Sequence, residues 1–309
     1  MSRTAANALL LLAGAIWGMG FVAQAAAMES IGPFLFVALR FAVASVVVLP
    51  FAWREARPAR SRGADEVPVP PRAVTPGELA RHALIGVALF GGMATQQVGL
   101  LTTSVTNSGF LTGLYVLFTP LLGIVLFREW PHVATWPAAA LALGGIALLS
   151  GGGGGLATGD LLTIASAVFW GLQVVLIGRF VGRTGRPLLL SLVQFAVTAS
   201  LAGIVAAVRE PFVVALVREA LPSILYAGVF ASGLAFTLQV IGQRCTTAPQ
   251  AAIFLSSEAP FAALFGRLLR DERIAASGFA GCAAILVAML MVELVPMLLA
   301  RNRRSRAVP

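Results

Sequence analysis

Long apolar runs separated by short polar gaps occupy almost the whole chain of 309 residues. Each run has the roughly 17–25 mostly apolar residues that an α-helix needs to cross a bilayer. The pattern therefore predicts an all-α integral membrane protein with ten transmembrane helices. They are expected at about residues 5–28, 33–53, 83–102, 107–127, 134–150, 159–178, 188–208, 223–243, 248–269 and 276–299.

The first apolar run admits a second interpretation. Arg3, the apolar stretch and the residues Ala23, Gln24 and Ala25 also match the pattern of a cleavable signal peptide. The sequence AIWGMGF at residues 15–21 is echoed, however, by VFWGLQV at residues 168–174, an offset of 153. We therefore expect the first helix to stay in the fold.

This echo belongs to a repeat that runs through both halves. PFLFVALRFAV at residues 33–43 returns as PLLLSLVQFAV at residues 187–197, an offset of 154. A third block aligns at an offset of 143, where Gln96 pairs with Gln239 and Glu129 pairs with Glu272. The fifth and tenth predicted helices show no convincing match. The domains expected are residues 1–150, a glycine-rich junction at 151–158, residues 159–300 and a basic tail at 301–309.

Five crossings in each half is an odd number, so the second half must enter the membrane the other way up. Inverted repeats of this kind are typical of secondary transporters, which bind their substrate near the bilayer midplane between the repeats. Channels and some membrane enzymes also arise by duplication, so the pattern favours a transporter without excluding them.

Arginines mark the membrane orientation. With the N-terminus inside the cell, the inside gaps, including a proline-rich loop at residues 54–81, hold 16 arginines against five outside. The positive-inside rule then predicts a multi-pass protein of the inner (plasma) membrane with both termini in the cytoplasm. The net charge of +9 is explained by these gaps, so we expect no nucleic-acid partner.

Composition argues against an enzyme. Hydrophobic residues make up 58% of the chain and all 22 basic residues are arginines. The absence of lysine removes the P-loop and Schiff-base lysines, and no HExxH or GxSxG motif is present. Cys245, Cys282, His82 and His132 are each solitary. We therefore expect no catalysis, cofactor or metal ion.

Several segments resemble a known family. The Trp-Gly pairs at residues 17–18 and 170–171, the ALRF of the second helix, FLTGLYVLFTPLLGIVLFREW and FLSSEAPFAALFGRLLRDER are similar to the EamA-domain transporters of the drug/metabolite transporter superfamily. The resemblance covers nearly the whole chain as two EamA-like units. It implies ten helices with cytoplasmic termini, a central cavity between the halves, and transport, often export, of amino acids, other metabolites or drugs.

Arg40 is the main candidate for substrate binding. It lies about seven residues, or roughly 10 Å, inside the outer end of its helix, where an arginine costs about 2.5–3.5 kcal/mol. One interpretation is a side chain that reaches back to the outer headgroups. The interpretation we favour is a cation that faces the bundle and binds a substrate carboxylate, because the matching residue Gln194 is polar too.

Glu258 is the other charged residue predicted within the membrane, near the middle of the ninth helix. A carboxylate at that depth without a compensating charge takes up a proton, because burial disfavours the charged form. Glu258 is therefore a candidate for proton coupling or for binding a substrate amine. A structural pair with Arg40 or a hydrogen bond between helices is the alternative.

The remaining candidates are polar amides and aromatic side chains. Each amide alone suits a bond between neighbouring helices, and each aromatic residue alone suits ordinary packing. Pairing across the repeat adds weight to some of them as substrate-binding residues. This set consists of Gln96, Gln194, Gln239, Asn107, Trp17, Trp170 and Tyr115.

These observations predict a secondary transporter that exports a small metabolite, such as an amino acid or a related polar or amphipathic solute, by alternating access. Proton coupling is part of this hypothesis. A lipid or lipid-phosphate flippase of the same fold is the alternative, and a channel or structural protein comes third. The expected partners are a small-molecule substrate and the lipid bilayer, and the choice between a monomer and a homodimer stays open.

Overall fold

The computed structural model describes residues 1–56, 74–103, 105–149, 157–270 and 276–306, and in these ranges every regular element is a helix. In chain order the helices are α1 (Arg3–Ala27), α2 (Pro33–Ala56), α3 (Pro76–Gly99), α4 (Val105–Thr112), α5 (Tyr115–Phe127), α6 (Thr135–Leu149), α7 (Thr158–Thr184), α8 (Pro187–Arg209), α9 (Val214–Glu219), α10 (Leu221–Leu225), η1 (Tyr226–Leu234), α11 (Ala235–Gly242), α12 (Ala248–Leu255), α13 (Glu258–Arg270) and α14 (Ala276–Arg306).

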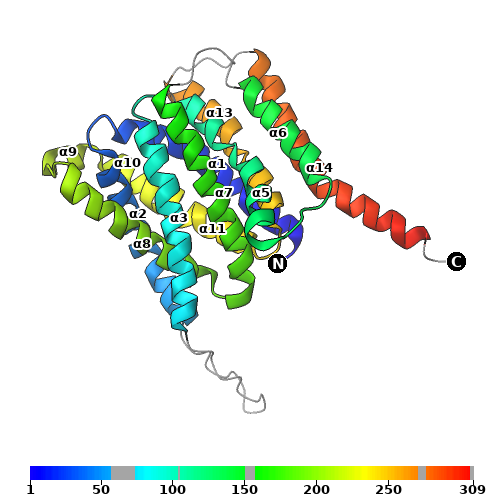
Figure 1. Ribbon diagram of the computed structural model, residues 1–309. Coiled ribbons are helices and arrows are strands. Elements are labelled where there is room, and N and C mark those ends of the chain that lie inside the picture. The colour runs from blue at the N-terminus through cyan, green and yellow to red at the C-terminus, as the bar shows by residue number, and fades with distance from the viewer. Residues whose placement is uncertain (57–73, 104, 150–156, 271–275, 307–309) are drawn as a thin grey trace.

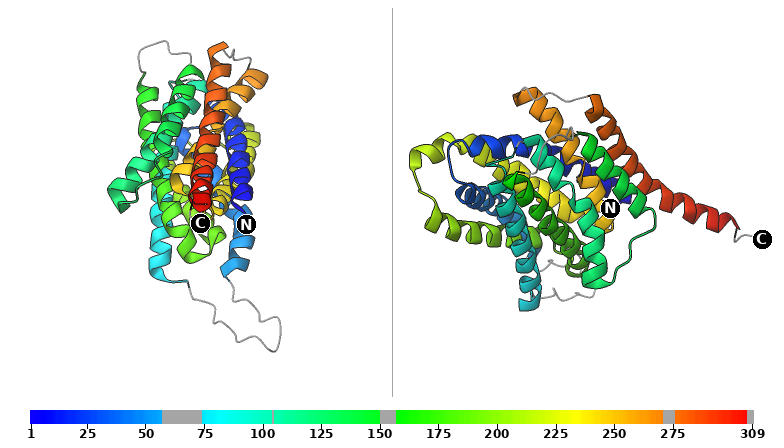
Figure 2. Two further views of the ribbon diagram at one scale, coloured as in Figure 1. Left: turned by 90° about the vertical axis from the view of Figure 1, so that its right-hand side faces the viewer. Right: turned by 45° about the horizontal axis from the view of Figure 1, so that its top comes forward.

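The helices form one bundle, shown in Figure 1. At its edges α2 pairs with α8 and α6 pairs with α14, while α1 packs on α11 and α13 and α7 packs on α3 and α5. The last turns of α14 extend away from the bundle (Figures 1 and 2). The start of α1, the end of α2 and the start of α3 lie at one end of the bundle, which we call the N-terminal face (Figure 2).

Seven segments of the described chain are long and apolar enough to cross a membrane, and α5 is a shorter apolar helix. Large apolar side chains on the outside of the bundle are exposed, including Val46, Val125 and Val208 at 70%, 76% and 77%. Exposed apolar surface on this scale suits contact with lipid rather than with water. The third, fourth and fifth predicted crossings are helical, but they fall outside the seven.

Two of the predicted helices are broken near their middles. The expected helix 107–127 is split between α4 and α5 at Gly113, and the expected helix 248–269 is split between α12 and α13 at Ser256. Pro260 explains the second break, because proline lacks the N–H that would bond the carbonyl four residues earlier. Broken helices at membrane depth are tolerated where they line a cavity, and both breaks here adjoin one.

Close contacts at two glycines bring α1 and α7 against these broken helices. A Cβ added to Gly18 of α1 would lie 2.4 Å from the Cβ of Phe261, and one added to Gly171 of α7 would lie 3.1 Å from the Cβ of Phe118. Any larger residue would push the helices apart, since small residues permit close backbone approach in membranes. Gly18 and Gly171 are 153 residues apart, and Phe118 and Phe261 are 143 apart. These are the offsets of the sequence repeat, so the two contacts are equivalent.

Carboxylates tie α2 and α8 together at both ends. Glu210, just after α8, accepts hydrogen bonds from the backbone N–H groups of Phe34 (2.9 Å) and Leu35 (2.7 Å) at the start of α2. Glu55, at the end of α2, accepts one from the N–H of Leu189 (2.8 Å) at the start of α8. Each carboxylate satisfies free N–H groups of the other helix and complements its dipole. This reciprocal capping fixes the helix that carries Arg40.

Candidate functional site: a polar chamber in the centre of the bundle

A chamber lies at the centre of the bundle, with a cavity volume of about 30 Å³. On this scale one buried water needs about 10–15 Å³, so the chamber is narrow. Its lining residues are Trp17, Gly20, Phe21, Gln24, Arg40, Met93, Gln96, Thr112, Tyr115, Trp170, Gln173, Val174, Ala231, Phe236, Gln239, Leu255 and Glu258. All of them except Trp17 are buried, so the chamber lies within the bundle.

Arg40 reaches the chamber from α2 with only 1% of its surface exposed. Its Nε donates to Ser232 Oγ at 2.9 Å and its Nη1 donates to Gln24 Oε1 at 3.1 Å. The guanidinium carbon lies 5.6 Å and 5.3 Å from the ring centres of Phe36 and Phe41, a cation–π geometry. No carboxylate of the described chain forms an ion pair with Arg40. The structure therefore buries a cation without a counter-ion.

Glu258 is the first residue of α13 and is 5% exposed. The helix N-terminus favours its negative charge, but none of the described arginines forms an ion pair with it. The hydroxyl of Tyr115 lies beside the carboxyl, although neither this hydroxyl nor Oε1 of Glu258 meets hydrogen-bond geometry. The carboxyl group is thus a second buried group with unused hydrogen-bonding capacity.

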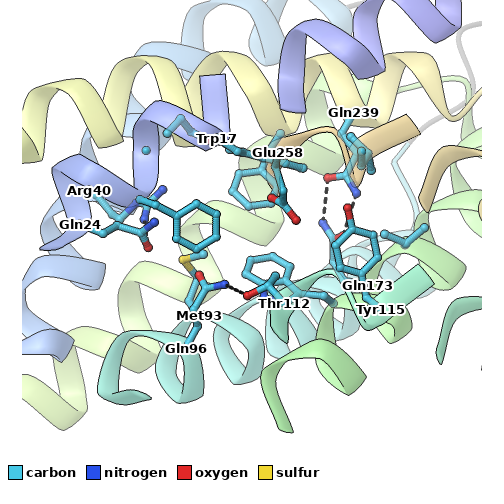
Figure 3. Close-up of a pocket in the computed structure, with 17 residues that line it drawn as sticks. Trp17, Gln24, Arg40, Met93, Gln96, Thr112, Tyr115, Gln173, Gln239 and Glu258 are labelled. Atoms are coloured by element: carbon cyan, nitrogen blue, oxygen red, sulfur yellow. Dashed lines mark hydrogen bonds between the residues drawn. The ribbon is translucent and has the colours of Figure 1, made fainter. Parts of the chain in front are cut away.

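Amides form the other end of the chamber. Gln239 Nε2 donates to Gln173 Oε1 at 3.0 Å, and Gln173 Nε2 lies within hydrogen-bond distance of Gln239 Oε1 (3.4 Å) and Gln194 Oε1 (3.2 Å). Gln96 Nε2 donates to Thr112 Oγ1 at 2.7 Å. Figure 3 shows Gln24 and Arg40 at one end, Gln173 and Gln239 at the other, and Glu258 between them.

Aromatic rings wall the chamber between these ends. The centroid of the Phe236 ring lies 4.7 Å from that of Trp17 and 5.8 Å from that of Trp170, the second pair being stacked. Trp17 Nε1 donates to the carbonyl of Ala231 at 2.8 Å. The site thus combines a cation, a carboxyl group, amides and aromatic faces. Within the described ranges no three His, Cys, Asp or Glu residues are grouped to hold a metal ion.

Most of the lining residues fall into pairs at the offsets of the sequence repeat. Fourteen of the seventeen form seven pairs at 153 or 143 residues, and only Gln24, Arg40 and Ala231 have no partner in the lining. The pairs are Trp17 with Trp170, Gly20 with Gln173, Phe21 with Val174, Met93 with Phe236, Gln96 with Gln239, Thr112 with Leu255, and Tyr115 with Glu258. The unpaired three form the corner around Arg40.

A π-helical segment, η1, distinguishes that corner. Gly86 of α3 packs on Gln194 and Val197, and Gly228 of η1 makes the corresponding contacts with Arg40 and Val43. These glycines are 142 residues apart, whereas Gln96 and Gln239 are 143 apart, so the second half has one extra residue in between. A π-helix is the usual way for a helix to absorb one inserted residue. The segment presents Ser232 to Arg40.

Comparisons with known proteins agree with this geometry. The model of the EamA-like transporter family matches residues 4–151 and again residues 157–294. The chain belongs to the EamA-like transporter family.

An uncharacterized transporter of Archaeoglobus fulgidus is 29% identical to this EamA-like transporter over 295 residues, which cover 95% of the chain and 87% of the relative. An uncharacterized transporter of Methanothermobacter thermautotrophicus is 29% identical over 184 residues, 56% of the chain and 52% of that protein. A solved crystal structure shares the fold with a TM-score of 0.76 and 22% identity, covering 96% of this chain and 99% of that one. The EamA-like transporter is thus a multi-pass membrane protein.

The structure brings seven of the nine predicted site residues of this EamA-like transporter to the chamber. They are Arg40, Gln96, Gln239, Glu258, Trp17, Trp170 and Tyr115. Gln194 is fully buried but lies behind Gln173, to which it is bonded, and not in the lining. Asn107 belongs to α4, and its side chain lies outside the described part of the structure.

Sequence reasoning missed several residues of the site, namely Gln24, Gln173, Thr112 and Ser232. Gln173 belongs to the segment VFWGLQV, but its equivalent in the first half is Gly20. A search for polar residues that recur at the repeat offset therefore does not find it. In the sequence, Gln24 stands out only as part of a leader-like pattern. Ser232 has no polar counterpart in the first half, because the residues 142 and 143 positions before it are Phe90 and Leu89.

Proposed function

We propose that this EamA-like transporter exports a small metabolite, such as an amino acid or related solute, across the inner membrane through the central chamber. The observation that carries the proposal is that Arg40 and Glu258 line the same buried chamber and that neither forms an ion pair with another residue of the described chain. Burying an unpaired charge costs several kcal/mol. A solute with a carboxylate and an ammonium group would offset that cost by supplying both missing partners.

Alternating access between two inverted repeats is the mechanism we propose. Support comes from the seven pairs of lining residues, from the equivalent contacts of Gly18 and Gly171, and from the two separate matches of the family model. The scheme takes ten crossings, with the broken helices α4–α5 and α12–α13 each counted once, and cytoplasmic termini as the positive-inside rule predicts. Residues 1–150 and 159–300 are then the two repeats.

Proton coupling is assigned to Glu258 in this scheme. A carboxyl group that is 5% exposed and has no ion-pair partner can exchange a proton as the chamber changes the side it faces. Binding of the substrate ammonium and binding of the proton would then compete for the same oxygens. Such competition couples export of the solute to entry of a proton.

Transport into proteoliposomes tests the proposal. Three probes share one carbon skeleton: L-phenylalanine carries both charged groups, 3-phenylpropionate only the carboxylate and phenethylamine only the ammonium. We expect flux of the zwitterion alone, driven by a pH gradient and lost in Arg40→Gln. A fluorescent phospholipid serves as the fourth probe. Lipid movement that depends on Arg40, with no flux of the three solutes, would instead establish a flippase.

A further inference from the structure

A second cavity opens at the N-terminal face, with a volume of about 490 Å³ on the scale that gives 30 Å³ for the chamber. We call it the vestibule. The residues that line it include Thr119, Glu129, Trp130, Gly178, Arg179 and Ala248. Trp130 is 76% exposed, and the Glu129–Arg179 ion pair (2.8 Å) is partly exposed, so the vestibule reaches the surface.

The vestibule continues the chamber along the same helix faces. On α5, Tyr115 lines the chamber and Thr119, one turn further, lines the vestibule. On α7, Val174 and Gly178 are related in the same way. Residues four apart lie on one face of a helix. The two cavities are therefore separated by about one layer of side chains, which includes Tyr115 and Val174, both at most 3% exposed.

The repeat offsets locate the equivalent positions near the opposite face. There Phe21, Val105 and Ala262 form a buried apolar cluster with Ala25 packed against it. We call it the Phe21 cluster. Its repeat equivalents are Val174 for Phe21, Gly178 for Ala25, Ala248 for Val105 and Thr119 for Ala262. Three of these four equivalents line the vestibule, and the fourth lines the chamber beside it.

We propose that the vestibule is the open end of the solute path and that the Phe21 cluster is its closed end. The proposal rests on the proposed function, because it takes the chamber as the substrate site. The structure then represents the state in which the path leads to the N-terminal face. In the alternate state the Phe21 cluster parts, and the residues that line the vestibule pack together in its place.

Side-chain volume explains why the seal forms at this face. Phe21 and Val105 are bulkier than Val174 and Ala248 at the equivalent positions. Packing of the larger apolar side chains excludes water and gains more contact energy than packing of the smaller ones. The state that is closed at the Phe21 cluster is therefore favoured at rest. With cytoplasmic termini this resting state takes up solute from the cytoplasm, as an exporter requires.

Cysteine accessibility tests the assignment without any solute. Val105→Cys and Ala248→Cys are matched variants at the offset of 143, each made with Cys245→Ser and Cys282→Ser. A membrane-impermeant maleimide is applied to either face in right-side-out and inverted vesicles. We expect Ala248→Cys to react from the N-terminal face at least tenfold faster than Val105→Cys reacts from the opposite face. Equal rates, or the reverse order, would overturn the proposal.

A loosened seal provides the second measurement. Phe21→Ala, combined with Val105→Cys, removes the largest side chain of the Phe21 cluster and shifts the population toward the state open at the opposite face. We expect labelling of Val105→Cys from that face to rise at least threefold while labelling of Ala248→Cys falls. Ala262→Gly, a milder change in the same cluster, replaces Phe21→Ala if the latter is poorly folded. Labelling unchanged by a folded variant contradicts the proposal, whereas absence of solute flux contradicts only the proposed function.

Discussion

The two polar ends of the chamber occupy related places in the fold but differ in charge. At one end Arg40 is held by Gln24 and by Ser232 of η1. At the other end Gln194, the residue 154 positions after Arg40, is joined to a neutral network of amides. The two ends differ by one arginine and by one inserted residue in the helix that this arginine contacts. These differences make one end cationic and leave the other neutral.

The difference shows how a nearly symmetric site acquires direction. Seven pairs of lining residues stand at the repeat offsets, so the two halves of the chain line the chamber with residues from equivalent positions. A solute bound in such a chamber has no reason to take one orientation unless the charges are unequal. The corner around Arg40 makes one end of the chamber cationic. Each prediction below changes either this cationic end or the neutral end formed by the amides.

The largest effect is expected for Arg40→Met. Losing a buried charged partner of a ligand costs about 2–5 kcal/mol, so affinity for a carboxylate solute should fall about 30-fold or more. Stability should change in the opposite direction, because an apolar side chain of similar length replaces a buried unpaired charge. Transport kinetics and thermal unfolding of the purified protein measure the two effects. A parallel loss of stability and transport would mean that Arg40 is structural.

Moving the cation sharpens the same comparison. Gln194→Arg, alone or with Arg40→Gln, places an arginine at the neutral end, where α3 has no inserted residue equivalent to the one in η1. We expect lower stability than in the wild type, by about 2 kcal/mol or more, since a fully buried position that now holds an amide bonded to Gln173 would have to hold a charge. Full recovery of carboxylate transport in the double variant would show that η1 is not needed.

Glu258→Gln is expected to have the next largest effect. The amide cannot take up a proton or pair with an ammonium group, and hydrogen bonds to charged groups contribute about 1.5–3 kcal/mol. Uptake of L-phenylalanine should therefore fall about tenfold or more and lose its response to a pH gradient. Binding of 3-phenylpropionate, which has no ammonium group, should weaken far less. An unchanged response to the gradient would exclude Glu258 from coupling.

Ser232→Ala tests the contribution of the π-helical segment. The change removes the acceptor of the Arg40 Nε hydrogen bond and leaves the charge in place. Hydrogen bonds to charged groups contribute from about 1.5 kcal/mol upward, so affinity for carboxylate probes should fall by about tenfold. Affinity for phenethylamine should not change, and Ser232→Thr, which keeps a hydroxyl, should restore much of the loss. An equal loss for all three probes would indicate general damage to the site.

Most of the fold and part of the site could be predicted from the sequence alone. The offset of 153 links Trp17 to Trp170, and the offset of 143 links Gln96 to Gln239, because in each pair both residues kept their type. Tyr115 and Glu258 are related by the same 143, but a phenol and a carboxylate share too little chemistry for the relation to be seen in advance. The family resemblance was confirmed by the match to the family model.

What could not be predicted depends on packing and register. Gln194 was expected to bind substrate because it matches Arg40, yet a Cβ on Gly86 would lie 3.0 Å from its Cα, so this part of α8 is packed against α3. Ser232 reaches Arg40 only through the π-helix, and an insertion of one residue leaves little trace in an alignment of two weakly similar copies. Apolar periodicity reports burial, but it does not report which buried polar groups face a cavity.

The smallest effect on transport is expected at the neutral end. Gln239→Leu breaks the bonds with Gln173 and leaves Oε1 of Gln173 without a donor, although Nε2 of Gln173 keeps Gln194 as an acceptor. Leaving this buried oxygen unsatisfied costs about 1–3 kcal/mol of stability. Transport should fall only about twofold, because the charged groups stay in place. The double variant with Gln173→Leu should recover only part of the stability, because it removes the unsatisfied oxygen of Gln173 but takes the donor away from Oε1 of Gln194. Thermal unfolding of the two single variants and the double variant measures this coupling. A Gln239→Leu protein that is stable but transports no carboxylate probe would move the binding site from the Arg40 corner to the amides.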